Sequence, residues 1–251
     1  MEMENNKFIA FDDIELVNKL VCGLTFSLEN ELHPLCLLAA EKLQLYLQEQ
    51  QEWKHNFGLS SENAEGTVIG KMFGVLVVRT KQNEVGYLAA FSGKLAGANH
   101  HSIFVPPVFD TLADGGFVNS GMRQLTHINA KIGLLESFRH AAYKEQIEQL
   151  KLLRKDHSFS LQNRIFDQYR FINKAGESRS LIDIFNKKPP AGAGECAAPK
   201  LLQYAFTHEM QPLALAEFWW GLSPKSSYWK HKHFYAPCKE KCGSILEHML
   251  G

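Results

Sequence analysis

The sequence has neither a strong excess of one charge nor a long apolar run. Its 251 residues include 27 basic and 27 acidic side chains, and this balance excludes a uniformly basic protein that coats nucleic acid. No apolar run approaches the roughly 20 residues that a membrane-spanning helix needs. Residues 1–7 are acidic and polar, without the basic stretch and apolar core of a secretory signal. We therefore expect a cytoplasmic protein that does not enter a membrane.

Cysteine is also scarce. The chain has five cysteines, an odd number, which in a long cytosolic chain does not indicate a disulfide framework. Hydrophobic residues make up 45% and charged residues 22% of the sequence, as in ordinary globular proteins. A chain of this length can bury a core without cross-links. We interpret Cys22 and Cys36, the latter on an apolar helix, as buried thiols.

The charge balance conceals a difference between the two halves of the chain. Residues 1–120 contain 8 basic and 15 acidic side chains, whereas residues 121–251 contain 19 and 12. This difference suggests that only the second half of the chain meets an anionic partner. The alternative is that the two halves are solvated faces of one fold and attract each other.

Apolar residues at helical spacing predict several helices. The first runs from residue 34 to about 53, and a longer helical segment covers 122–174, where Ser158 marks an interruption between two helices. Two more helices are expected from 197 to about 208 and from Pro237 onward, because proline is tolerated in the first turn of a helix.

Three apolar runs have the length of strands. They lie near 72–79, 85–91 and 212–220, and a polar turn joins the first two into a predicted hairpin. Gly74 and Gly86 within this hairpin indicate close packing or bulges.

The order of these elements predicts three units along the chain. Residues 1–30 show no clear period and are expected to form an irregular leader. Residues 31–121 and 180–251 are expected to form one α/β domain with a mixed sheet between layers of helices. Residues 122–179 are expected to project from it as a helical insertion.

Three cysteines stand at predicted junctions between loops and helices. Cys196 follows a glycine-rich loop, Cys238 follows a proline, and Cys242 lies one helical turn later. The N-terminus of a helix favours the thiolate, which is the form that binds metal. These residues therefore predict a tetrahedral zinc site, with His231 or, as we favour, His233 as the fourth ligand. The alternative is that Cys196 and Cys238 are small residues of the core.

A basic and aromatic segment precedes the last helix. Phosphate contacts and base stacking on such a segment would suit RNA, and the alternative is a cover over the metal site. Its cationic candidates are Lys225, Lys230, His231 and Lys232, and its aromatic residues are Tyr228, Trp229, Phe234 and Tyr235.

The element order and the cysteines resemble the zinc-dependent nucleoside and nucleobase deaminases. Their signature is His-or-Cys-x-Glu followed by Pro-Cys-x-x-Cys, with the glutamate as the proton shuttle. Here Cys196 is followed two residues later by Ala198, and Cys238 and Cys242 are separated by three residues. The resemblance implies a three-layer deaminase-like scaffold with zinc, but alanine cannot transfer a proton. Glu195 and Glu217 are the other carboxylates considered near the metal, and neither fits the signature.

A second resemblance extends over about residues 33–250. Seven blocks are similar to the long N-terminal extension of large bacterial RluA-type RNA pseudouridine synthases, namely residues 33–40, 70–78, 86–93, 104–108, 189–202, 216–221 and 238–249. The catalytic aspartate of that family, in an Arg-Leu-Asp context, is absent from this sequence. The resemblance therefore implies a non-catalytic zinc-binding accessory module in RNA modification, beside a pseudouridine synthase catalytic domain or another protein partner. An active deaminase-type zinc hydrolase and a protein-interaction domain are the alternatives.

Overall fold

The computed structural model describes residues 6–28, 31–59, 69–223 and 226–251. Its main sheet has five strands in the order β1-β3-β2-β6-β7, and every neighbouring pair is antiparallel. The strands are β1 (Ile9–Ala10), β2 (Lys71–Arg79), β3 (Val85–Phe91), β6 (Gln211–Trp220) and β7 (Phe234–Tyr235). The three apolar runs of the sequence therefore lie in one sheet, as predicted.

The expectation of a mixed sheet is wrong for the strands of this sheet. Both β3 and β6 pair with β2 in antiparallel register, so they run in the same direction with β2 between them. The long connection from β3 to β6 thus joins parallel strands that are not neighbours. The strand β7 returns along β6 through a loop and is antiparallel to it as well.

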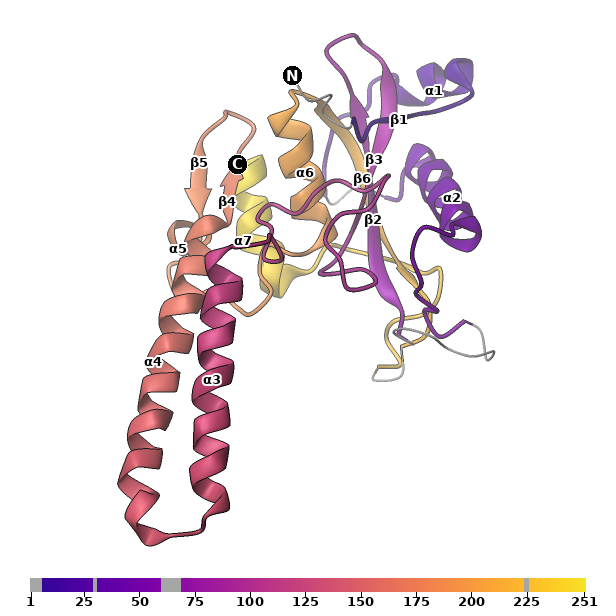
Figure 1. Cartoon of the computed structure of the whole chain (residues 1–251). Coiled ribbons are helices and arrows are strands. Elements are labelled where there is room, and N and C mark those ends of the chain that lie inside the picture. Colours follow the sequence, from indigo (N-terminus) through magenta and orange to yellow (C-terminus); the bar gives the residue numbers. More distant parts are fainter. Residues whose placement is uncertain (1–5, 29–30, 60–68, 224–225) are drawn as a thin grey trace.

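Helices cover both faces of the sheet (Figure 1). One face is covered by α1 (Ile14–Val21) and α2 (Pro34–Glu49), and the other by α6 (Ala197–Thr207) and α7 (Lys239–Leu250). Each face has its own core of buried side chains. The result is a three-layer arrangement of mixed α/β structure.

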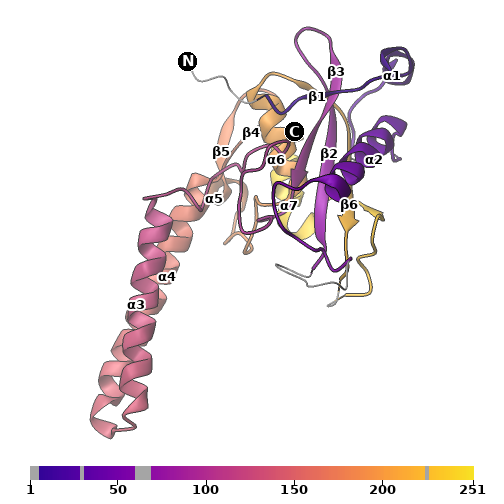
Figure 2. The ribbon, with the colours of Figure 1, turned by 45° about the vertical axis from the view of Figure 1, so that its right-hand side comes forward.

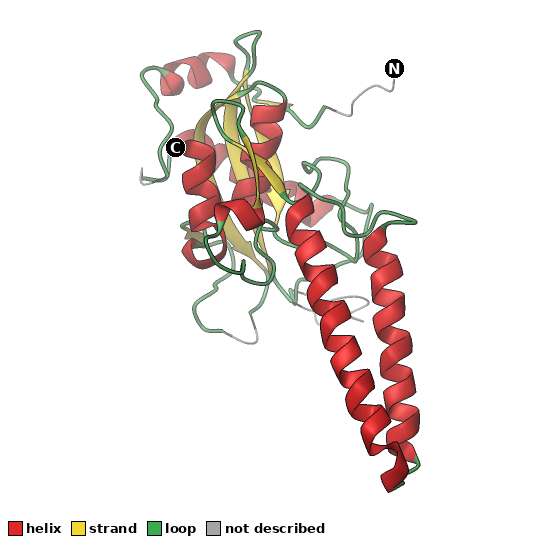
Figure 3. Ribbon diagram, turned by 90° about the vertical axis from the view of Figure 1, so that its left-hand side faces the viewer, coloured by secondary structure: helices red, strands yellow, loops and turns green. Residues whose placement is uncertain are grey.

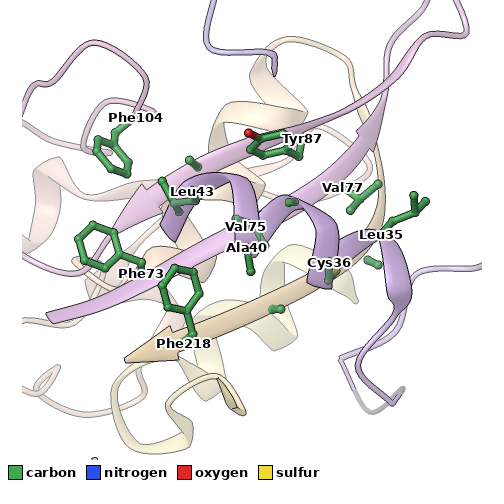
Figure 4. Close-up of a cluster of buried hydrophobic side chains, with 14 of the residues drawn as sticks. Leu35, Cys36, Ala40, Leu43, Phe73, Val75, Val77, Tyr87, Phe104 and Phe218 are labelled. Carbon is green, nitrogen blue, oxygen red and sulfur yellow. The ribbon is translucent and has the colours of Figure 1, made fainter. Parts of the chain in front are cut away.

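The central strand β2 contributes to both cores by alternation of its side chains. Phe73, Val75 and Val77 belong to the core beneath α2, where Figure 4 shows them with Phe218 of β6. The intervening residues of β2 pack beneath α6 and α7. Because both faces of this strand are buried, its sequence is a continuous apolar run instead of an alternating one.

A helical hairpin, here called the arm, projects from this body (Figures 2 and 3). It consists of α3 (Phe117–Ser137), a 3₁₀ turn (Ala141–Tyr143) and α4 (Lys144–Gln168). The expected interruption at Ser158 is wrong, because α4 is continuous there. The chain reverses instead at Arg139, which has a positive φ of 50°.

Several short elements were not predicted. Residues 1–30 were expected to be irregular but include β1 and α1, and the Asp13 side chain caps α1 by accepting from the backbone N–H of Leu16. A two-stranded sheet of β4 (Arg170–Ile172) and β5 (Ser178–Ser180) follows the arm, and then α5 (Leu181–Ile184).

Within the described ranges, no helix combines the length and the apolar character needed to cross a membrane.

Candidate functional site

The N-termini of α6 and α7 place the three predicted cysteines. Cys196 is the N-cap of α6 and Cys238 is the N-cap of α7, and neither side chain makes a capping hydrogen bond. Cys242 lies one turn into α7, where its N–H donates to the Cys238 carbonyl at 3.2 Å. Close approach of the sheet to α6 depends on Gly74, because a Cβ there would lie 2.9 Å from the Cβ of Ala197.

Cys196 and Cys242 form a thiol pair. The Cys242 side chain hydrogen-bonds to Cys196 and thereby lowers the pKa of Cys196, although burial and the Glu217 charge oppose this effect. The positive charges of Lys241 and Lys200 act in the same direction as the hydrogen bond. The same hydrogen bond and burial raise the pKa of Cys242. This hydrogen bond therefore moves the pKa values of the two thiols in opposite directions.

Glu217 on β6 places a carboxyl group at the start of α6. The backbone N–H of Ala198 donates to Oε1 of Glu217 at 2.9 Å, and the side chain is buried. Burial raises the pKa of Glu217 to about 7, since the charged form loses its hydration. A carboxylate thus does approach Ala198, where the deaminase signature has its glutamate, but it comes from the neighbouring strand.

A buried lysine, Lys200, lies near Cys196 and Glu195. The Nζ of Lys200 donates to the carbonyls of Phe91 and Gly93 at 2.9 and 3.1 Å, and burial lowers the pKa of Lys200 to about 8. The Tyr169 hydroxyl donates to Oε1 of Glu195 at 3.1 Å. Glu195, the other carboxylate considered from the sequence, is therefore engaged with Tyr169. Sequence reasoning missed Lys200, since a helical lysine is ordinarily exposed.

The predicted zinc ligands do not all come together. Cys238 is partly exposed and lines a groove of about 1080 Å³ beside α7. The His233 side chain is exposed. Among the described residues, no group of three or more histidine, cysteine, aspartate or glutamate side chains is arranged to hold a metal ion. The thiol chemistry suits zinc, but as placed the four residues do not fit a closed site.

Residues 219–223 and 226–235, here called the aromatic loop, contain a cluster of aromatic rings that contact one another. Trp219 stacks on Trp229 with centroids 5.5 Å apart, and Tyr228 and Tyr235 each contact Trp229. The Tyr235 hydroxyl donates to the Tyr228 carbonyl and accepts from the N–H of Lys230, both at 2.7 Å. The Tyr228 ring remains 64% exposed. The cluster therefore offers an ordered aromatic surface to solvent.

The cationic candidates of this loop differ in their roles. Lys230 and Lys232 are exposed, and the Lys232 ammonium lies 5.5 Å from the centroid of the Trp220 ring. His231 instead holds the loop, because its Nδ1 accepts from the N–H of Gly221 at 2.9 Å. Burial and the Lys232 charge lower the pKa of His231, so it does not supply positive charge at neutral pH. Lys225 lies outside the described residues.

Comparison of the chain with protein-family models, with curated proteins and with solved structures found no match. The fold and the site described above are those of a mixed α/β protein with a thiol pair and an exposed aromatic loop.

Proposed function

We propose that this chain is a non-catalytic accessory module of RNA modification that contacts single-stranded RNA through its aromatic loop. The observation that carries the proposal is the exposed Tyr228 ring, which contacts Trp229 and Tyr235 and is followed along the chain by the exposed Lys230 and Lys232. Bases stack on such rings whatever their sequence, and lysines beside them attract the phosphates. The modification chemistry would come from a pseudouridine synthase catalytic domain, as the sequence resemblance implies.

The burial of Ala198, Glu217 and Cys242 supports a non-catalytic role. Ala198 and Cys242 have no exposed surface, and Glu217 is only 3% exposed. A substrate would have to open the core to reach these groups. A deaminase-like scaffold and a structural zinc ion remain part of the proposal, and zinc binding would require Cys238 to turn toward the thiol pair.

Binding of a fluorescent single-stranded RNA, followed by anisotropy at two salt concentrations, tests RNA contact. Replacing Tyr228 with alanine removes one stacking surface, which is worth roughly 1–3 kcal/mol per base, or about 5- to 150-fold in Kd. Lys230→Ala should weaken binding and reduce its salt dependence. Phe138→Ala and Lys19→Ala are matched controls, because Phe138 is also exposed, at 58%, and Lys19 is exposed on α1. Equal loss in the controls would contradict a site on the aromatic loop.

The arm supports a second candidate function, a protein-interaction domain. All residues from 151 to 160 of α4 are exposed, including Leu152 at 62% and Phe159 at 55%. Residues 117–168 carry eight basic and five acidic side chains. This surface would suit a helix with apolar and acidic side chains, such as one of the catalytic partner. Leu152→Glu should abolish binding of that partner and leave RNA binding unchanged. If the partner still binds to the Leu152→Glu protein, this surface is excluded.

A further inference from the structure

A stripe of residues along the last helix is open to solvent. The helix α7 lies beside α6 on the face of the sheet opposite α2 (Figure 1). Lys239 and Glu247 of α7 are exposed, and the partly exposed Gly243 lies between them, four residues from each. Residues four apart lie on the same side of a helix, so these three form one stripe. The same three residues line the groove of about 1080 Å³ beside α7.

Gly243, in the middle of the stripe, is not required by the packing of a single chain. Outside the backbone of its own helix, a Cβ at this position would meet no atom of the described chain within 4 Å. Glycine is less favourable than alanine inside a helix, and what it permits is the close approach of another backbone. The stripe is therefore shaped to let a second helix pack closely across Gly243.

The groove beside the stripe also has apolar walls. Phe26 and Leu28 come from the segment between α1 and α2, Phe206 comes from the end of α6, and Leu250 comes from the end of α7. All four side chains are only partly buried. A helix that covered the stripe would remove more of this apolar surface from water, which favours association.

The charges of the stripe match those of a second copy of the chain. In two antiparallel α7 helices that cross at Gly243, the residue four positions before the crossing lies opposite the residue four positions after it. Lys239 of each copy therefore faces Glu247 of the other. Four helical residues rise about 6 Å, so both charge pairs flank the crossing closely. Lys174, another charged residue of the groove, lies near the far end of α7, where its N–H donates to the carbonyl of Met249 at 3.0 Å.

We propose that the chain forms a two-fold symmetric dimer in which the groove beside α7 receives α7 of a second copy. Such an interface uses the same patch on both copies, so the patch must be complementary to itself. The stripe meets this condition, because its basic and acidic residues lie at equal distances on either side of Gly243. The two charge pairs fix the antiparallel direction and the register of the helices. The groove has no residue of the aromatic loop in its lining, so the dimer does not depend on the RNA contact proposed above.

Sedimentation equilibrium of the full chain, free of RNA and kept in a thiol reductant, tests the dimer. We expect a reversible dimer at micromolar concentrations of protein, and a single chain throughout that range would overturn the proposal. Lys239→Glu and Glu247→Lys should each weaken the dimer by at least roughly 10-fold in Kd, because each turns both attractive pairs into repulsive ones. If the wild type is a dimer and both variants dimerise equally well, the interface lies elsewhere and the proposal is wrong.

Mixing the two variants separates a paired interface from a general effect of charge. The Lys239→Glu protein has two acidic residues on its stripe and the Glu247→Lys protein has two basic ones, so an equimolar mixture should form a heterodimer. A mixture that stays monomeric while the wild type dimerises would contradict the antiparallel pairing.

The central glycine gives an independent test of the close approach. Gly243→Gln should weaken the dimer, because the new side chain separates the two helices. Gly133→Gln is the matched control, since Gly133 lies within α3 and a Cβ there would also meet nothing within 4 Å. Equal dimerisation of the two glycine variants would show that the helices do not cross at Gly243 and would overturn the proposed interface.

Discussion

Glu217 should make the stability of the fold decrease as the pH rises. Burial raises its pKa from about 4.5 to about 7, so the folded chain holds the proton more tightly than the unfolded chain does. This stabilisation is fully present below about pH 4.5 and is lost as the pH approaches about 7. Each pKa unit corresponds to roughly 1.4 kcal/mol. The free energy of unfolding should therefore fall by about 2–3 kcal/mol between about pH 5 and 8 because of this one carboxyl group.

Glu217→Gln isolates this contribution. Glutamine does not titrate, and its side-chain oxygen can still accept from the N–H of Ala198. Urea unfolding at about pH 5 and 8 gives the change in the free energy of unfolding with pH for the metal-free wild-type and variant proteins. In the difference between these two changes, the contributions of other titrating groups such as Lys200 cancel. Glu84→Gln, at an exposed site in the turn before β3, is the control. The reasoning fails if wild type and Glu217→Gln show the same pH dependence within about 0.5 kcal/mol, since additivity errors are of that size.

Three other outcomes are expected. Lys200→Ala should lower the free energy of unfolding by about 2–4 kcal/mol, because it removes the ammonium donor to the buried carbonyl of Phe91 and to the partly buried carbonyl of Gly93; urea unfolding measures this, and Lys19→Ala should have little effect. If Cys238 turns toward Cys196 and Cys242, metal analysis should find one zinc ion per chain, lost in Cys196→Ala and kept in Cys22→Ala. Because Ala198 supplies no carboxyl group, ammonia release from cytidine, adenosine or single-stranded RNA should not exceed that of the metal-free protein, and higher release would favour the deaminase alternative.

The sequence predicts most of the body and less of the way its parts connect. Long apolar runs identify β2, β3 and β6, because strands buried on both faces leave little room for polar residues. The two-residue strand β1 and the eight-residue helix α1 are too short to show a period. The reversal at Arg139 has no glycine or proline to mark it, whereas Ser158, a weak helix breaker, is accommodated within α4. Strand order is a tertiary property that the order of elements along the chain does not determine. The mixed sheet, which was inferred from the deaminase-like order of elements, is therefore not formed.

The sequence identifies most of the residues of the candidate site but not how they are placed relative to one another. The spacing of Cys238 and Cys242 and the loop before Cys196 identify two helix N-termini, and the structure pairs one thiol from each. Lys200 could have been recognised from its neighbours, since Ala197, Ala198, Leu201 and Leu202 are all buried. A lysine among such residues must find acceptors inside the core. Which acceptors it finds depends on β3, a hundred residues away in the sequence.

The arm leaves and re-enters the body at adjacent points. Near its base, the Arg164 guanidinium lies 4.3 Å from the centroid of the Phe117 ring, and a Cβ on Gly121 would lie 2.7 Å from Leu161. These contacts hold α3 and α4 together at the base of the hairpin. An α-helix rises 1.5 Å per residue, so the 21 residues of α3 span about 30 Å. Adding or removing matched turns in α3 and α4 would change the reach of this protein in steps of about 5 Å without altering either core.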